Sequence, residues 1–165
     1  DDNAAPYIIL RSPLLEVGSP RALALAKECI DECVQRHKSC MSSNLPDSRR
    51  LPTHVIDCTN LAHPRLVSTD GRSGKYLTLS YVWGLDQIHK TTTSNVSQYE
   101  CGIDLSLLPA TIRDAIYVTH ALGLQFLWVD SLCIIQDSNE DKRHEIRRMH
   151  HIYRHSHLTI IAASA

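Results

Sequence analysis

Hydrophobic and polar positions follow two regular patterns in the second half of the chain. Residues 125–130 form a nearly unbroken apolar run that ends in Asp130, and a run of this length without a polar face is typical of a fully buried parallel strand. Residues 76–81 and 158–162 form two further apolar runs of strand length. They predict two more strands, of which the second is also expected to be buried.

Apolar residues at helical spacing separate these predicted strands. One amphipathic pattern predicts a helix over residues 108–122 that Gly123 ends, and a more charged pattern predicts a helix over about 139–155. Strand, helix, strand, helix, strand is the order that gives a parallel sheet with right-handed crossovers. The expected fold class is therefore α/β, a parallel sheet with flanking helices whose strand order the pattern does not give.

The first 75 residues are expected to form an N-terminal extension to a second unit at 76–165. Ser19 followed by Pro20 predicts the start of a helix over about 20–38. Further predictions are a strand at 53–58, a polar loop at 41–50, a turn at 69–74 and an edge strand at 7–10. The apolar stripe expected on the helix consists of Ala22, Leu25, Ala26, Cys29, Ile30 and Cys33.

Composition limits the classes of function. The 17 basic and 18 acidic residues give a net charge of −1, so charge does not indicate a nucleic acid or an anionic membrane as partner. No apolar stretch approaches the roughly 20 residues that a membrane-spanning helix needs. Six cysteines in 165 residues are too dilute for a disulfide scaffold. The sequence therefore predicts a cytoplasmic protein with reduced thiols and no membrane span.

Four sequence blocks in the second half carry a resemblance to a known family. They are Leu79-Ser-Tyr-Val-Trp-Gly84, Leu108-Pro-Ala-Thr-Ile-Arg-Asp-Ala115, Phe126-Leu-Trp-Val-Asp-Ser-Leu-Cys-Ile-Ile-Gln-Asp137 and Glu145-x3-Met149-x2-Ile152-Tyr153. In this order and at this spacing they resemble the fungal heterokaryon incompatibility (HET) domain. The upstream Cys33-x3-His37-x2-Cys40 also resembles segments that often precede that domain.

The resemblance implies a role in fungal non-self recognition and in triggering regulated cell death. It also implies self-association and contacts with death-pathway or incompatibility partners. The family is regarded as a distant relative of Toll/interleukin receptor (TIR) domains, which implies a TIR-like, flavodoxin-like sheet. Some TIR domains cleave the nicotinamide–ribose bond of NAD, so NAD is a possible substrate. The function is either this enzymatic one or that of a non-enzymatic, self-associating interaction module.

The catalytic group of such a reaction is not expected within this chain. In TIR domains the catalytic glutamate follows the third strand, and the incompatibility family has a tryptophan-to-glutamate motif in a comparable place. This chain ends at Ala165, before any such residue. Because small doubly wound domains usually have about five strands, the three-strand series also indicates an incomplete domain from a larger protein.

Polar side chains follow two of the predicted strands at the edge where open α/β sheets bind ligands. A nucleoside needs a carboxylate for its ribose hydroxyls, an aromatic ring for stacking, and hydroxyl or amide groups for orientation. The candidate ligand-binding residues are Ser80, Tyr81, Trp83, Asp130, Ser131, Gln136 and Asp137. In the alternative interpretation, the two aspartates accept backbone N–H bonds and cap the next helix, while Trp83 packs in the core.

Glu145 is the one candidate for catalysis within the chain, and it has two interpretations. The favoured one is a solvated network of charges one helical turn apart, because Asp141, Arg143, Arg147 and Arg148 are near it in the sequence. In the other, the carboxyl group faces inward near the ligand-binding edge, where it would suit a general acid.

Cysteines and histidines suggest metal chemistry that the spacing limits. Cys33, His37 and Cys40 have the ligand types that zinc prefers. On one continuous helix Cys29 and Cys40 would be about 16 Å apart, so they cannot share one ion. Buried thiols are the favoured interpretation, and neither zinc nor another bound cofactor is expected. Cys133 is expected to be a core thiol, and the run His144, His150, His151, His155 and His157 an exposed helix face.

Overall fold

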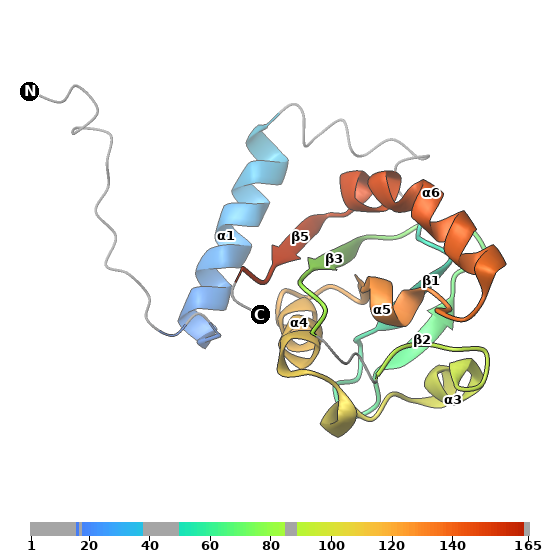
Figure 1. The fold of residues 1–165 in the computed structure, drawn as a ribbon. Helices are drawn as coiled ribbons and strands as arrows, with labels where there is room; N and C mark the ends of the chain where they lie inside the picture. The colour runs from blue at the N-terminus through green and yellow to red at the C-terminus, as the bar shows by residue number, and fades with distance from the viewer. Residues whose placement is uncertain (1–15, 17, 38–49, 85–88, 164–165) are drawn as a thin grey trace, which may run out of the picture.

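The computed structural model describes residues 16, 18–37, 50–84 and 89–163. Its strands form a single open sheet, with helices packed against it (Figure 1). The strands are β1 (His54–Asp57), β2 (Arg65–Ser68), β3 (Tyr76–Ser80), β4 (Phe126–Trp128) and β5 (Leu158–Ile161). The helices are α1 (Pro20–Arg36), α3 (Val96–Cys101), α4 (Ala110–Ala121), α5 (Asp130–Cys133) and α6 (Asn139–His155), with a 3-10 turn η4 at Leu105–Leu107.

The sheet is mixed, with the order β2-β1-β4-β3-β5 among the described strands. Strand β3 pairs in parallel with β4 on one side and with β5 on the other, as the order of the elements predicted. Strand β1 pairs antiparallel with both β2 and β4. The α/β fold class and the parallel pairing of the three second-half strands are therefore confirmed.

Strand β2 was not predicted, and it shows how the first half joins the sheet. It has only four residues, of which Leu66 is buried and Arg65 is exposed, so its pattern is too short to identify a strand. Together β1 and β2 supply two strands to the sheet that contains β3, β4 and β5. The division at residue 75 remains a prediction.

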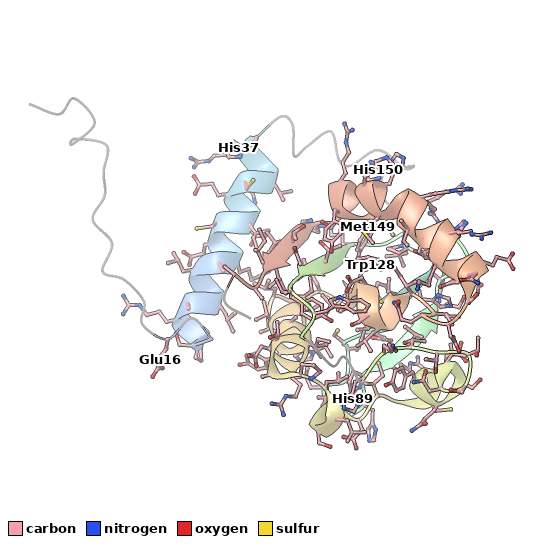
Figure 2. The ribbon with its side chains drawn as sticks, viewed as in Figure 1. Glu16, His37, His89, Trp128, Met149 and His150 are labelled. Carbon is pink, nitrogen blue, oxygen red and sulfur yellow. The ribbon has the colours of Figure 1, made fainter. Side chains whose placement is uncertain are left out.

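The two faces of the sheet are covered by different helices. Tyr76, Thr78 and Trp128 lie in register on one face, where the Tyr76 hydroxyl donates to the carbonyl of Ile152 in α6 at 2.7 Å. The ring of Trp128 meets that of Tyr153 in α6 edge to face, with centroids 5.5 Å apart. Figure 2 shows Trp128 and Met149 on the inner side of α6 and His150 on its outer side.

The alternate side chains of the same strands point to the other face. Leu77, Leu79 and Leu127 are fully or almost fully buried there, and α4 packs against β3 and β4. The residues that α4 buries are Ile112, Ala115, Ile116 and Thr119. Gly123, at φ +76°, ends the α4 segment as predicted, because this backbone conformation is strained for other residues. The central strands β3 and β4 are therefore covered by helices on both faces.

Helix α1 begins as predicted but is covered less than predicted. The Ser19 hydroxyl accepts a hydrogen bond from the Ala22 N–H at 3.3 Å, and Pro20 is the first helical residue. In the expected apolar stripe, Ile30 packs against the core, whereas Ala26 and Cys29 are exposed. No described residue of α1 is buried, because the helix lies at the β5 end of the sheet (Figure 1).

Two predictions about the strands were wrong in detail. Strand β5 is not buried: its first three residues are half-buried and Ile161 is 73% exposed, because β5 has a neighbour on one side only among the described strands. Strand β4 ends at Trp128, and Asp130 is the first residue of the short helix α5 rather than the last residue of a strand.

Some predictions fall on parts of the chain that lie outside the described residues. They are the edge strand at 7–10, nearly all of the polar loop at 41–50, and Cys40. Within the described ranges, no helix combines the length and the apolar character that crossing a bilayer requires.

Replacing Tyr76 by Phe tests the contact between α6 and the sheet. The substitution leaves the buried Ile152 carbonyl without its donor, so we expect the free energy of unfolding to fall by about 1–2 kcal/mol, measured by urea denaturation. Tyr117→Phe in α4 is the matched control, since its side chain is 44% exposed, and should change stability by less than about 0.5 kcal/mol. Equal stability of the two variants would contradict the role given to this hydrogen bond.

Candidate functional site

The carboxyl ends of β3 and β4 lie side by side, and the residues that follow them meet. Trp83, three residues after β3, donates its indole N–H to both carboxylate oxygens of Asp130, at 3.1 Å to Oδ1 and 3.0 Å to Oδ2. Asp130 follows β4 by two residues and opens α5. This contact places an aromatic ring and a carboxylate at one edge of the parallel strands, as the sequence predicted.

Two hydroxyl groups lie directly beside this pair. The Tyr81 hydroxyl is 2.8 Å from the Ser131 hydroxyl, and the Ser131 N–H donates to Asp130 Oδ1 at 2.7 Å. Ser131 is buried, whereas Tyr81 is half-buried. We call Tyr81, Trp83, Asp130 and Ser131 the carboxyl-edge cluster. Trp83 is 37% exposed, which rules out the alternative in which it packs in the core.

A loop that the sequence did not single out holds the backbone of α5, which carries part of the cluster. Thr91 is buried, its hydroxyl donates to the Leu132 carbonyl at 2.6 Å, and its N–H donates to the Ser131 carbonyl at 3.0 Å. The Gln136 N–H donates to the Thr91 carbonyl at 2.8 Å. Thr91 is the first of three consecutive threonines in a polar stretch, so nothing in the pattern set it apart.

The remaining predicted residues lie around the cluster rather than in it. The Gln136 amide donates to the backbone carbonyls of Asp130 and Ile134, so it holds the loop. The Asp137 carboxylate accepts from the N–H and the hydroxyl of Thr93, at 2.8 and 2.7 Å. Ser80 ends β3 and pairs with Ile161 of β5.

The alternative role of the aspartates as helix caps holds only in part. Asp130 accepts one backbone N–H, from Ser131. Helix α6 is capped by Ser138, whose hydroxyl accepts from the Asp141 N–H at 3.2 Å, and not by Asp137. Asp137 instead joins the loop at Thr93 to the start of α6.

The two aspartates are in opposite electrostatic environments. Burial raises the pKa of the Asp130 carboxyl group and outweighs the hydrogen bonds from Trp83 and Ser131, which lower it. The exposed Asp137 has a lowered pKa, because the hydroxyl and the N–H of Thr93 bind its charged form. The protein therefore stabilises the ionised form of Asp130 less than that of Asp137. Hydrogen bonds from a ligand's hydroxyl groups would stabilise the ionised Asp130 further.

Tyr153 of α6 also approaches the cluster, which the sequence did not indicate. Its hydroxyl donates to the Leu79 carbonyl at 3.2 Å. Burial first, and then the negative charges of Asp130 and Tyr81, raise the pKa of Tyr153 to about 12. The sequence predicted Tyr153 only as an apolar position of the helix. Its hydroxyl group is what links it to the carboxyl end of β3, through Leu79.

Glu145 contradicts the favoured prediction of a solvated charge network. Its side chain is 0% exposed, because position 145 shares the inward face of α6 with Met149 and Ile152. The Thr53 hydroxyl donates to Glu145 Oε1 at 2.6 Å, while Oε2 has no hydrogen-bond partner among the described residues. This hydrogen bond connects the carboxyl group to Thr53, the residue directly before β1.

Metal chemistry gains no support from the described residues. Cys33 Sγ and His37 Nδ1 are 3.3 Å apart, and Cys40 lies outside the described ranges. No group of three or more His, Cys, Asp or Glu side chains in residues 16, 18–37, 50–84 and 89–163 could hold a metal ion. Cys133 is buried and its pKa is raised by that burial, which confirms a core thiol. In the histidine run, His144, His150 and His151 are exposed, whereas His155 and His157 are half-buried.

Replacing the two aspartates by Asn should change the pH dependence of stability in opposite directions. The folded-state pKa of Asp130 is raised, so the stability contributed by this group is present below its unfolded pKa and is lost as pH rises. Asp130→Asn should therefore become more stable relative to the wild type between about pH 4 and pH 7. Thermal unfolding at several pH values measures the difference.

Asp137→Asn is the control of opposite sign. The lowered pKa of Asp137 means that its stabilising contribution is present above the unfolded pKa and is lost as pH falls. This variant should be less stable than the wild type at about pH 7 and should approach it on acidification to about pH 3. The same slope for both variants would refute the opposite environments described above.

Comparison with known proteins identifies the family. The family described as heterokaryon incompatibility protein (HET) matches residues 76–165, more than half of the chain. A curated relative, heterokaryon incompatibility protein 6, OR allele, from Neurospora crassa, is 33% identical over 94 residues. That alignment covers 52% of this chain but only 14% of the relative, so the chain spans a small part of the relative's length. No solved structure matches the chain.

The family match begins at the first residue of β3 and includes all three parallel strands and the carboxyl-edge cluster. It also includes Glu145, Met149, Ile152 and Tyr153, the residues that form the inner side of α6. Because this match covers more than half of its length, the chain belongs to the heterokaryon incompatibility protein (HET) family.

Proposed function

We propose that this chain is a signalling domain of fungal heterokaryon incompatibility, which acts in non-self recognition and triggers regulated cell death. The family match and the name of the Neurospora crassa relative support the incompatibility role. The domain would act in the cytoplasm by self-association and through contacts with other incompatibility proteins. The carboxyl-edge cluster is the part of the structure that we connect with this signal.

We further propose that the carboxyl-edge cluster binds a nucleoside ligand, with NAD as the first candidate. The observation that carries this proposal is the pair formed by Trp83 and Asp130, since it combines a stacking surface with an acceptor for ribose hydroxyls. The pair lies where parallel strands end, which is the usual ligand position in open α/β sheets. We choose NAD among nucleosides because of the resemblance to TIR domains that the sequence suggests.

In NAD hydrolysis, water replaces nicotinamide at the ribose carbon, which gives ADP-ribose, nicotinamide and a proton. The cluster would bind and orient the ribose, and we assign no catalytic residue in this chain. Glu145 is unsuitable as a catalytic residue in this position, because its carboxyl group is fully buried and accepts a hydrogen bond from Thr53. The proposal is therefore one of ligand binding by this chain.

Tryptophan fluorescence can test ligand binding because the two tryptophans have different environments. Trp83 is 37% exposed and Trp128 is 0% exposed, so a ligand at the cluster should change the emission of Trp83 only. Titration with NAD should give a saturable change that Trp83→Phe abolishes. Asp130→Asn should weaken NAD binding by about tenfold, the loss expected for one hydrogen bond to a charged group.

Asp114→Asn is the matched control for this titration, since it removes an exposed carboxylate from α4, away from the cluster. It should leave NAD affinity unchanged. A signal that survives Trp83→Phe, or an equal loss in both aspartate variants, would show that NAD does not bind at the cluster.

A second candidate function, an interaction module without enzymatic activity, is favoured by apolar exposure at the same edge. Val82 is 72% exposed beside Trp83, and Ile161 at the end of β5 is 73% exposed. Exposed apolar side chains that lie near one another are typical of protein contact sites. On this interpretation the cluster shapes a surface through which copies of the chain associate.

Two variants expressed in a fungal host separate the two functions. If ligand binding drives the signal, Asp130→Asn should weaken NAD binding and abolish cell death, while Val82→Asp should leave NAD binding intact. If association alone drives it, Val82→Asp should abolish cell death and give monomers in light scattering, while Asp130→Asn remains active. Cell death in both variants would contradict a role for this edge.

A further inference from the structure

We propose that a pocket at the amino ends of β3 and β5, on the opposite edge from the carboxyl-edge cluster, binds the phosphate groups of a small anion. The pocket has a volume of about 210 Å³. Its basic side chains are Arg50 before β1 and Arg148, His151 and His155 of α6, and Tyr76 and Pro52 also line it. We call it the amino-edge pocket. It shares no residue with the cluster, so this proposal does not depend on the proposed function.

The described lining of the pocket is rich in basic side chains. None of the described side chains that line the pocket is acidic. Arg148 Nη1 contacts the Thr53 hydroxyl at 3.4 Å and His144 Nε2 at 3.0 Å, which are neutral or basic groups. No carboxylate of the described residues lies within 4.0 Å of the Arg50 or Arg148 guanidinium. An anion would therefore meet two guanidinium groups that form no direct ion pair with a described carboxylate, since Glu145 reaches Arg148 only through the Thr53 hydroxyl.

His151 lies among several other basic side chains of α6. The pKa of His151 is lowered, first by His150 and then by burial, His155, Arg154 and Arg148, because each positive neighbour disfavours the charged imidazole. The other groups around the pocket are Arg50, from the segment before β1, and the Tyr76 hydroxyl of β3, which donates to Ile152. A bound anion would reverse the effect on His151 and stabilise its protonated form.

Phosphate chemistry fits both the donors and the size. Guanidinium groups bind phosphate oxygens through paired N–H donors, and two imidazoles add further N–H donors. The volume is smaller than the roughly 300 Å³ at which pockets begin to hold drug-sized ligands. One or two phosphoryl groups therefore fit the amino-edge pocket, and the rest of a larger molecule such as a nucleotide would remain outside it.

Titration calorimetry with inorganic pyrophosphate at low ionic strength tests the proposal. Arg148→Gln and Arg50→Gln should each weaken binding by about tenfold, the loss expected for a hydrogen bond between charged groups. Arg147→Gln is the matched control, since it removes the same charge from an exposed position one residue away on α6 that does not line the pocket. It should change the affinity less than about twofold.

Two further measurements make the result specific. In NMR spectra of the histidine rings, pyrophosphate should raise the pKa of His151 and leave the ring signals of the exposed His63 unchanged. Titration with ADP distinguishes the source of the phosphates: binding at least as tight as that of pyrophosphate assigns the site to a nucleotide, and much weaker binding assigns it to the free anion. Thermal unfolding of each variant confirms that it is folded.

The proposal would be overturned by either of two results. One is the absence of pyrophosphate binding at millimolar concentration together with unchanged His151 signals. The other is an equal loss of affinity in Arg147→Gln and Arg148→Gln, which would indicate general attraction to a basic helix instead of a defined pocket.

Discussion

The packing of α6 across β3 and β4 is the interaction on which the rest of this structure depends. It joins the Tyr76 hydroxyl to the Ile152 carbonyl, the Tyr153 hydroxyl to the Leu79 carbonyl, and the ring of Trp128 to that of Tyr153. Each partner in these pairs is distant in the sequence, so the contacts fix where α6 crosses the strands. Because Asp130 follows Trp128 by two residues, the same packing fixes where the carboxylate emerges.

Helix α6 also gives the two edges of the sheet their different character. Its first turn carries Glu140 and Asp141 and its last turn carries Arg154 and His155, an arrangement that suits the helix dipole. Since the helix follows the carboxyl end of β4 and leads to the amino end of β5, it runs from the carboxyl-edge cluster to the amino-edge pocket. One charge-asymmetric helix thus separates a carboxylate-containing edge from a cationic one.

The sequence was sufficient to predict elements whose residues have one dominant environment. The apolar run before Asp130, the bounds of α6 and the start of α1 at Pro20 follow from local patterns, and the structure agrees with them. The pairing of Trp83 with Asp130 was also within reach, because parallel strands bring their carboxyl ends together. In the first three cases neighbours in the sequence determine the outcome, whereas the Trp83–Asp130 pair follows from the parallel strands that the order of elements predicts.

The features that the sequence missed depend on partners distant along the chain. The burial of Glu145 requires Thr53, 92 positions earlier, and the order of the strands requires β1 to insert next to β4. The exposure of β5 follows from its place at the end of the described sheet, which an apolar run does not reveal. Thr91 supports the cluster only because a loop folds back onto α5.

The position of β5 has a consequence for the order in which the fold assembles. Its contact with β3 joins residues 81 positions apart, as in the pair Thr78 and Thr159, whereas β1 and β2 are neighbours in sequence. Contacts between residues far apart in the sequence form slowly, so β5 should join the sheet last during folding. Strands with little buried apolar surface open most easily, so β5 should also be the first to detach. Its release would bare one hydrogen-bonding side of β3 while leaving the β3–β4 ladder beneath Asp130 in place.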